Sequence, residues 1–520
     1  MAVDPADSLV RALDEHNPWW ERGADAFSLP ARQRSDFYHL ARPDDEGSQF
    51  EDQPILGLTG RRGAGKTTLL KQFVQHRIQQ GDAPEQFCYL PFDADPLFQL
   101  QSDEQLRRAV RYYENRVLSA VDEERPHFLL LDDVHLIEHP NKTTIEGWGT
   151  PVAKLIEDAP RRHVAVTASA GVQVDRELDR VGIDESEYGV QPILPEKFRD
   201  YVFSLYPDLE EGDTRVSPTS LREGEHSLPE VLRTGDVEPF VAELRRKYEQ
   251  VEGEERRIQS QLVDYLAMGG IVSYAQDGVV ESASDLESAD YAMLRENVRD
   301  ALYQEVPGFE SIQTIGDLER LCALAARNRG GESLKYQDLV DLFDVDRRTI
   351  VDSYLPALET LYLLTGVNEY DNARPRSVRL FLRDPGLVVA LTGGSAGSVL
   401  ADFDLETDLA RVTAFDHTMR FAYGIEAIQG RDEAPSVQYW EGREGEVDFV
   451  FEVDGTPVPV GLAYRSGDRE VTRSAIGEFR SEYEAPIGIL LTGDTAGRAS
   501  IEDVQQGIVT LPYWFYLLLC

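Results

Sequence analysis

The chain has 520 residues, of which 94 are acidic and 52 are basic, so its formal net charge at pH 7 is −42. This length allows about two to four domains, and a hydrophobic fraction of 42% is enough to fill their cores. A charge this negative excludes a dense basic coat for nucleic acid and a polybasic patch for membrane surfaces.

Lysine is scarce, because only seven of the basic residues are lysines. A surface rich in carboxylates and poor in lysine is typical of proteins from salt-loving archaea, so we interpret the chain as halophilic and archaeal. At molar salt the Debye length is only about 3 Å, and the repulsion between surface carboxylates is then screened. The alternative is an ordinary acidic protein.

The three cysteines, Cys88, Cys322 and Cys520, have no metal-ligand spacing and indicate no disulfide framework. Residues 1–11 lack the apolar core of a signal peptide. The longest apolar stretch, residues 507–520, is too short to span a bilayer comfortably. We therefore expect a cytoplasmic protein with no membrane partner.

A phosphate-binding loop is the strongest motif of the chain. The buried strand Ile55–Leu58 is followed by the pattern G-x-x-x-x-G-K-[ST], and a helix follows from Thr68 to about Gln80. Backbone N–H groups of such a loop surround phosphate oxygens, the lysine contacts the β- and γ-phosphates, and the threonine hydroxyl is a Mg²⁺ ligand. The predicted ATP-binding residues are Gly60, Arg61, Arg62, Gly63, Ala64, Gly65, Lys66, Thr67 and Thr68.

A second acidic motif ends the strand that begins at His127. Asp132 is predicted to hold Mg²⁺ together with Thr67, and Asp133 to polarise the attacking water. The segments 87–90 and 164–169 are predicted strands of the same parallel sheet, because both are short apolar runs. Thr167 or Ser169 is a candidate sensor of the γ-phosphate at the carboxyl edge of the sheet, although Ser169 could equally be a simple helix cap. With Lys66, Asp132 and Asp133 form the predicted catalytic set.

These motifs, in this order, resemble the AAA+-like ATPases of archaea and bacteria whose C-terminal region is related to restriction-endonuclease folds. The resemblance covers most of the chain and rests on residues 17–20, 34–37, 131–135, 167–170, 194–201 and 265–270, besides the phosphate-binding loop. Two departures stand out. Asp133 occupies the position where the family has a glutamate, which could slow hydrolysis, and the family's arginine after the sensor strand has only weak counterparts in Arg176 and Arg180.

The middle of the chain is predicted to contain a linker, a lid and a winged helix. Residues 206–237 are rich in Pro, Gly, Ser and Glu, which is typical of a surface linker, and residues 240–275 are helical and would cover the nucleotide. Residues 317–384 fit a winged helix whose recognition helix spans 346–361 and begins with Arg347 and Arg348. Arg374, Arg376, Arg379 and Arg383 make its wing locally basic, so DNA is a candidate partner, with simple packing as the alternative.

The last region, from about residue 402, alternates helices and strands and resembles the endonuclease fold. That resemblance implies an aspartate followed by Glu-x-Lys on the next strand. Asp448 is a plausible aspartate, but Gly461-Leu462-Ala463 stands where Glu-x-Lys should be, and Glu426 and Glu446 cannot replace the lysine. We expect a degenerate scaffold.

The predicted fold is α/β: an AAA+-like P-loop NTPase parallel sheet with a helical lid, a winged helix and a C-terminal endonuclease-like domain. The predicted domain limits are 1–50 (helical extension), 51–205 (ATPase core), 206–300 (linker and lid), 301–400 (winged helix) and 401–520. The predicted function is ATP binding and hydrolysis with Mg²⁺, which moves the later modules. The alternatives are a nucleotide-gated DNA-binding regulator with little hydrolysis, an ATP-dependent nuclease, and a purely structural interaction protein.

Overall fold

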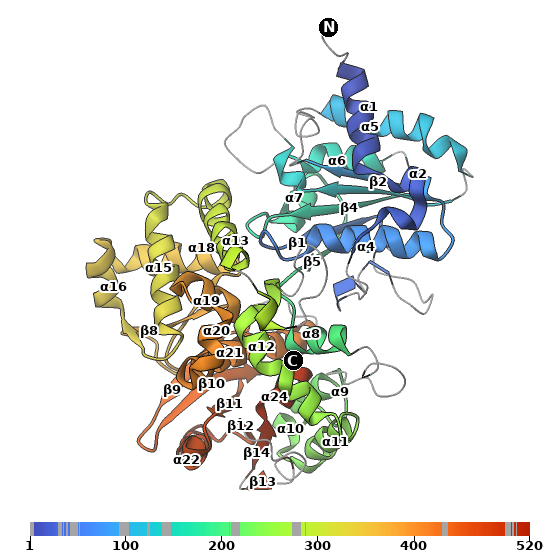
Figure 1. Ribbon diagram of the computed structural model, residues 1–520. Coiled ribbons are helices and arrows are strands. Elements are labelled where there is room, and N and C mark those ends of the chain that lie inside the picture. Colours follow the sequence, from blue (N-terminus) through green and yellow to red (C-terminus); the bar gives the residue numbers. More distant parts are fainter. Residues whose placement is uncertain are drawn as a thin grey trace.

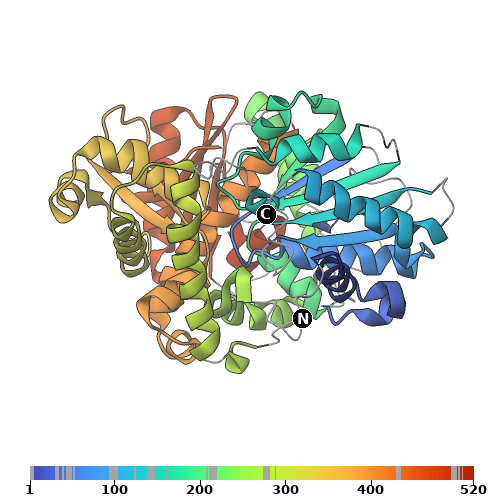
Figure 2. The ribbon, with the colours of Figure 1, turned by 90° about the horizontal axis from the view of Figure 1, so that it is seen from above.

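The protein forms two lobes that lie side by side (Figures 1 and 2). The computed structural model describes the chain except residues 1–4, 30–33, 35, 38–39, 42–49, 51–52, 93–102, 122–124, 138–146, 158, 160, 207–208, 210–218, 273–281, 287, 429–434, 494–500, 502–503 and 506. We call the described residues 5–192 the N lobe and those from 198 to 520 the C lobe.

The N lobe is built on a five-stranded parallel sheet with the order β2-β3-β4-β1-β5. Its strands are β1 (Ile55–Thr59), β2 (Phe87–Pro91), β3 (His127–Asp132), β4 (Arg162–Ala168) and β5 (Tyr188–Pro192). The first four were expected from their apolar runs. The edge strand β5 was not, because it is half-exposed and contains glycine and proline, two residues that are depleted in strands.

Helices cover both faces of this sheet, because alternate side chains of each strand point to opposite faces. Leu129 and Leu131 pack with one set of helices, whereas Phe128 and Leu130 pack with the other. The first set is α1 (Pro5–His16), α5 (Asp103–Arg116), α6 (Gly149–Ile156) and α7 (Val174–Arg180); the second is α2 (Trp19–Arg22) and α4 (Lys66–Gln79).

The C lobe begins with a group of helices. They are α8 (Phe198–Leu205), α9 (Thr219–Arg222), α10 (Leu228–Thr234), α11 (Glu238–Glu249), α12 (Glu255–Val272) and α13 (Ser288–Asp300). The segment expected to be a linker is partly helical, since α9 and α10 bury Leu221, Leu228 and Val231; its residues 207–208 and 210–218 lie outside the described part. Helices α11 and α12, expected as the lid, pack into the core of the C lobe.

A three-stranded antiparallel sheet with the order β6-β8-β7 follows. Its strands are β6 (Leu334–Lys335), β7 (Leu364–Val367) and β8 (Ser377–Leu382), and its helices are α14 (Val306–Phe309), α15 (Ile315–Asn328), α16 (Tyr336–Phe343), α17 (Arg347–Thr349) and α18 (Leu355–Thr360). The helix expected over 346–361 is interrupted by a π turn at Ile350–Tyr354, just before Pro356. Proline has no N–H to donate, so a regular α-helix cannot continue through it.

The last part of the C lobe is a mixed six-stranded sheet with the order β13-β14-β12-β11-β10-β9. The strands are β9 (Val437–Glu441), β10 (Glu446–Val453), β11 (Thr456–Ala463), β12 (Gly488–Thr492), β13 (Val504–Gln505) and β14 (Ile508–Pro512). Helix α22 (Arg469–Tyr483) covers one face, and α21 (Phe403–Ile428) and α24 (Tyr513–Leu519) cover the other. Two short helices, α19 (Pro385–Thr392) and α20 (Ala396–Ala401), connect the two sheets.

The C lobe has a small hydrophobic cluster beneath α22 and one large core that runs through the rest of the lobe. Its buried side chains extend from Phe198 to Cys520 and include the helices, the small sheet and one face of the large sheet. The two cores of the N lobe, one on each face of its sheet, are separate clusters. Within the part that the structure describes, no helix is long and apolar enough to cross a membrane.

Candidate nucleotide-binding site

The loop between β1 and α4 has the backbone geometry of a phosphate cradle. Gly65 has φ 96°, a conformation that costs glycine little and other residues much. A Cβ at Gly60 would lie 2.4 Å from the carbonyl oxygen of Ile193, so only glycine fits there. The Lys66 Nζ donates to the carbonyl oxygens of Gly60 (2.6 Å) and Arg61 (3.2 Å). The lysine is thus held inside the loop, where incoming phosphates would replace these carbonyls as its partners.

Asp132, at the end of β3, accepts hydrogen bonds from three hydroxyl groups. Its carboxylate accepts hydrogen bonds from Thr67 Oγ1 (2.7 Å), from the Tyr89 hydroxyl (2.6 Å) and from Thr167 Oγ1. The Asp132 side chain is buried, with 4% of its surface exposed. The Thr67 hydroxyl and the Asp132 carboxylate are oxygen ligands of the kind Mg²⁺ prefers, and they already touch, so these residues fit a Mg²⁺ ion. The contact of Tyr89 with Asp132 was not predicted from the sequence, because a tyrosine inside a buried strand belongs to no recognisable motif.

Asp133 and Thr167 are tied together next to this pair. The backbone N–H of Asp133 donates to Thr167 Oγ1 (2.8 Å), and Asp133 has the left-handed conformation with φ 55°. Thr167 therefore bridges the two aspartates and fixes the turn that presents Asp133. Because its hydroxyl is used in this way, Thr167 holds the geometry of the two aspartates.

His135 is a second residue that the sequence did not single out. Its Nδ1 is buried and has no hydrogen-bond partner among the described residues. Burial first, and the positive charge of Lys66 second, lower the pKa of His135 to about 3. A neutral imidazole with an unused nitrogen thus lies close to the phosphate-binding lysine.

The strand order brings these groups to one edge of the sheet. Strand β4, which ends next to Ser169, lies between β3 and β1. In a parallel sheet the carboxyl ends of all strands lie on the same edge, where ligands of α/β proteins bind. Ser169 is therefore placed between Asp132 and the phosphate-binding loop. Its Oγ donates a hydrogen bond to the carboxylate of Glu305, a residue of the C lobe.

The two arginines of the loop point to the boundary between the lobes. Arg61 has 4% of its surface exposed, and its Nε and Nη2 have no hydrogen-bond partner among the described residues. Burial lowers the pKa of Arg61 to about 10, while the charges of Asp384 and Asp416 in the C lobe act against that shift. Arg62 is mostly exposed, with its Nη1 3.9 Å from the carboxylate of Asp300.

Another arginine, Arg34, supports the loop from the N-terminal segment. Its Nη1 donates to the carbonyl oxygen of Ala64 (2.8 Å), and its Nη2 donates to that of Leu194 (2.5 Å). The candidates for the family's arginine behave differently, because Arg180 bonds Glu177 and Arg176 bonds Gln173, each within or beside helix α7.

Comparison with known proteins agrees with this geometry. Residues 52–199 match the AAA domain family, and residues 261–398 match a domain of unknown function, DUF8612. The N lobe has a P-loop NTPase fold of the AAA type. An uncharacterized protein of Methanocaldococcus jannaschii is 22% identical over 495 residues, which are 94% of this chain and 89% of that protein.

Two solved structures have a weak overall similarity to this chain. The Walker-type ATPase PABY2304 of Pyrococcus abyssi has a TM-score of 0.30 and 13% identity, covering 66% of this chain and 92% of its own. The ORC1 protein of Aeropyrum pernix in complex with DNA has a TM-score of 0.25 and 13% identity, covering 75% and 93%.

Outside the AAA-type lobe, the predicted basic wing offers fewer free positive charges than its sequence indicates. Arg379 and Arg383 are buried and paired with Glu446 and Asp416, respectively, so they are not available to a ligand. The remaining predicted DNA contacts divide into two groups. Arg347 and Arg348 are exposed but interact within the protein, with the carbonyl of Pro375 and with Asp352, respectively, and Arg374 and Arg376 are exposed as well.

At the expected nuclease position, the carboxylate of Asp448 is already bonded to other groups of the protein. The carboxylate of Asp448 accepts hydrogen bonds from the backbone N–H of Leu462 (2.7 Å) and from Arg411 Nε (3.3 Å). Glu446 pairs with Arg379, which turns it away from a metal-binding role. Among the described residues there is no group of three His, Cys, Asp or Glu that could hold a metal ion. These observations disfavour the ATP-dependent nuclease.

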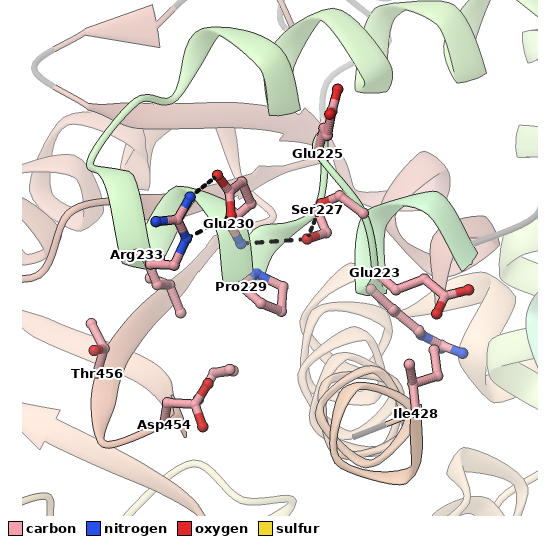
Figure 3. A pocket seen from close by; sticks show the side chains of 13 residues that line it. Glu223, Glu225, Ser227, Pro229, Glu230, Arg233, Ile428, Asp454 and Thr456 are labelled. Carbon is pink, nitrogen blue, oxygen red and sulfur yellow. Dashed lines mark hydrogen bonds and ion pairs between the residues drawn. The ribbon is translucent and has the colours of Figure 1, made fainter. Parts of the chain in front are cut away.

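A separate pocket of about 690 Å³ lies on the C lobe, between α9–α10 and the β10–β11 hairpin (Figure 3). Glu230 in its wall is paired with Arg233, and the Ser227 hydroxyl caps helix α10. Its other charged side chains include Glu223, Glu225 and Asp454, so the pocket is mainly acidic. An acidic pocket does not suit a nucleoside triphosphate, so the candidate nucleotide site is the edge of the N-lobe sheet.

Proposed function

We propose that the protein is a Mg²⁺-dependent ATPase in which the nucleotide controls how the C lobe sits on the N lobe. One observation carries the proposal: Thr67 and Thr167 both donate hydrogen bonds to Asp132 at the carboxyl edge of the parallel sheet, and Lys66 is held by carbonyl oxygens of the adjacent phosphate-binding loop.

Each residue has a defined task in this proposal. The loop N–H groups and Lys66 bind the phosphates, and Thr67 and Asp132 hold Mg²⁺. Bound there, Mg²⁺ would neutralise charge on the phosphates. Asp133, fixed by Thr167, orients the attacking water and accepts its proton. Lys66 offsets the negative charge that develops on the transferred group.

Arg61 supports coupling between the lobes. Its side chain leaves the phosphate-binding loop and reaches the buried charges around Asp384. Asp384 accepts hydrogen bonds from the backbone N–H groups of Gly270 (2.8 Å) and Leu387 (3.2 Å) and so ties α12 to the start of α19. A shift of the loop on phosphate binding would act directly on this junction. Because one large core runs through most of the C lobe, the lobe would move as a unit.

The proposal is tested by phosphate release from Mg²⁺-ATP in molar KCl. We expect Lys66→Ala to abolish hydrolysis, and Asp133→Asn to bind ATP but lower turnover by roughly a hundredfold or more. Lys335→Ala, which removes an exposed lysine of the C lobe, is the matched control and should keep wild-type activity. Equal rates for the wild type and Lys66→Ala would contradict an ATPase.

The same assay separates the regulator alternative. A DNA-binding regulator with little hydrolysis would show tight ATP binding, negligible phosphate release and nucleotide-dependent DNA affinity. Arg374 and Arg376 are exposed, as are Arg347 and Arg348, so the double change of Arg374 and Arg376 to glutamate should then weaken that affinity and reduce its salt dependence.

A further inference from the structure

A short segment of the C lobe, residues 300–309, reaches the nucleotide edge of the N lobe. The Ser169 hydroxyl donates to the Glu305 carboxylate, and Asp300 lies 3.9 Å from Arg62. The ring of Phe309 packs directly over Gly171, where a Cβ would come within 2.2 Å of it. Three contacts of different kinds thus hold the segment against the phosphate-binding loop and the residues that follow β4.

The backbone of this segment is shaped for the contact. Helix α13 ends at Asp300, residues Ala301–Glu305 form a π turn, and α14 starts at Val306. A π turn shifts the register of side chains compared with a continuous α-helix, and such turns are frequent at functional sites. Glu305, its last residue, is directed at Ser169. Leu302 and Val306 on either side are buried in the core of the C lobe, so the position of Glu305 is linked to the position of that lobe.

Glu305 is surrounded by a hydroxyl donor and positive charges, which are the groups that bind a phosphate in proteins. Its carboxylate shares the hydroxyl of Ser169 and lies within the electrostatic influence of Lys66, Arg62 and Arg61. Burial raises the pKa of Glu305, and the serine and the three cations act in the opposite direction. A carboxyl group is therefore already present beside Ser169, within the electrostatic influence of the phosphate-binding lysine.

We propose that Glu305 takes the place of the γ-phosphate in the nucleotide-free protein and thereby sets the discrimination between ATP and ADP. The proposal rests on the ATP-binding function proposed above. A γ-phosphate brings negative charge to Ser169 and Lys66 and must displace the carboxylate, whereas ADP leaves the contact of Glu305 with Ser169 intact. Displacement of Glu305 moves residues 300–309, and with them the C lobe, away from the sheet edge.

The discriminating experiment measures equilibrium binding of Mg²⁺-ATPγS and Mg²⁺-ADP to the full-length chain in molar KCl. Glu305→Gln keeps the size and hydrogen-bonding shape of the side chain but removes its charge. We expect it to tighten ATPγS binding by about tenfold and to change ADP binding by less than about twofold. Glu296→Gln is the matched control, since it removes one negative charge from an exposed position on α13, and both affinities should stay at the wild-type values.

A second variant and a second readout make the result independent of one substitution. Glu305→Ala should shift the ATPγS-to-ADP preference in the same direction. Hydrogen exchange of the backbone amides in residues 301–309 of the wild type should speed up with ATPγS and stay unchanged with ADP.

An unchanged nucleotide preference in both Glu305 variants, with binding abolished by Lys66→Ala, would overturn the role of Glu305 and leave the ATPase function standing. Absence of binding by the wild type and the Glu305 variants alike would overturn both proposals.

Discussion

At the scale of single residues, the site is held by hydroxyl groups around one carboxylate. The P-loop and Asp132 could be recognised from sequence because their chemistry demands fixed residue types at fixed spacing. Tyr89 and Thr167 could not be assigned in the same way, since their roles come from the neighbouring strands β2 and β4, which place their hydroxyls against Asp132. The strand order, which the sequence leaves open, decides these contacts.

Tyr89→Phe tests the support of Asp132. Loss of the hydroxyl leaves the carboxylate with the bonds from Thr67 and Thr167 and frees it to rotate. We expect the Mg²⁺ concentration for half-maximal hydrolysis to rise by about tenfold, because partners of metal ligands typically contribute 10- to 100-fold in affinity. A Mg²⁺ titration of phosphate release measures this. An unchanged midpoint would show that Tyr89 only fills space.

His417 gives a prediction for acid stability. This buried histidine accepts from the backbone N–H of Phe198 at Nε2 (3.3 Å) and bonds the carbonyl of Thr413 through Nδ1 (3.0 Å), an arrangement that requires the neutral ring. Burial lowers the pKa of His417 to about 3, against about 6.5 for an unfolded histidine. Below pH 6.5 the unfolded chain therefore binds a proton that the folded chain does not, and stability falls as the pH falls.

The measurement compares denaturant unfolding of the wild type and His417→Gln between pH 7.5 and pH 4.5 in molar KCl, a window of roughly two pH units below the unfolded pKa. The variant should be less stable at neutral pH, and its loss of stability on acidification should be smaller by up to about 1.4 kcal/mol per pH unit. Parallel curves would contradict a neutral buried imidazole.

At the scale of elements, the junction between the lobes depends on close backbone contact. The backbone N–H of Glu196 donates to the carbonyl of Gly270 (3.0 Å), and the Tyr265 hydroxyl donates to the carbonyl of Glu196 (2.7 Å). Helix α12 is thus hydrogen-bonded to the strand-to-helix connection that follows β5. The Gly-Gly pair was visible in the sequence, but its partner, 74 positions earlier in the chain, was not.

Gly270→Ala tests this contact. An added Cβ would lie 2.2 Å from the carbonyl oxygen and 2.5 Å from the nitrogen of Glu196, both backbone atoms, so one of the elements must move. We expect a loss of about 1–3 kcal/mol in the free energy of unfolding. Gly397→Ala in α20, with nothing closer than 3.8 Å, should be neutral or stabilising by about 0.4–1 kcal/mol. Denaturant unfolding of both variants provides the comparison, and equal effects would refute the close-contact argument.

At the scale of the whole molecule, the charge of −42 should make stability depend on salt. Raising KCl from 0.1 M to 1 M shortens the Debye length from about 10 Å to about 3 Å and screens the repulsion between carboxylates. We expect Tm to rise by roughly 5–10 °C, which corresponds to about 5–11 kcal/mol at an unfolding entropy of about 2.1 cal/mol/K per residue for 520 residues. Sucrose, which is excluded from protein surfaces but screens nothing, is the control. A similar rise in sucrose would exclude charge screening as the cause.

The sequence by itself was enough to predict the phosphate-binding loop, the strand that ends at Asp132 as a candidate Mg²⁺ site, and the two sensor candidates at the end of β4. These depend on residue type, spacing and hydrophobic periodicity within short segments, which are readable along one chain. Only the tertiary structure decided that Glu305 bonds Ser169, 136 positions away in the chain. It also decided that Arg61 is buried between the lobes and that Arg379 and Arg383 form ion pairs with carboxylates of the protein. Contacts between residues far apart in the chain depend on how the elements pack, and the pattern of a short segment does not show which distant side chain each residue will meet.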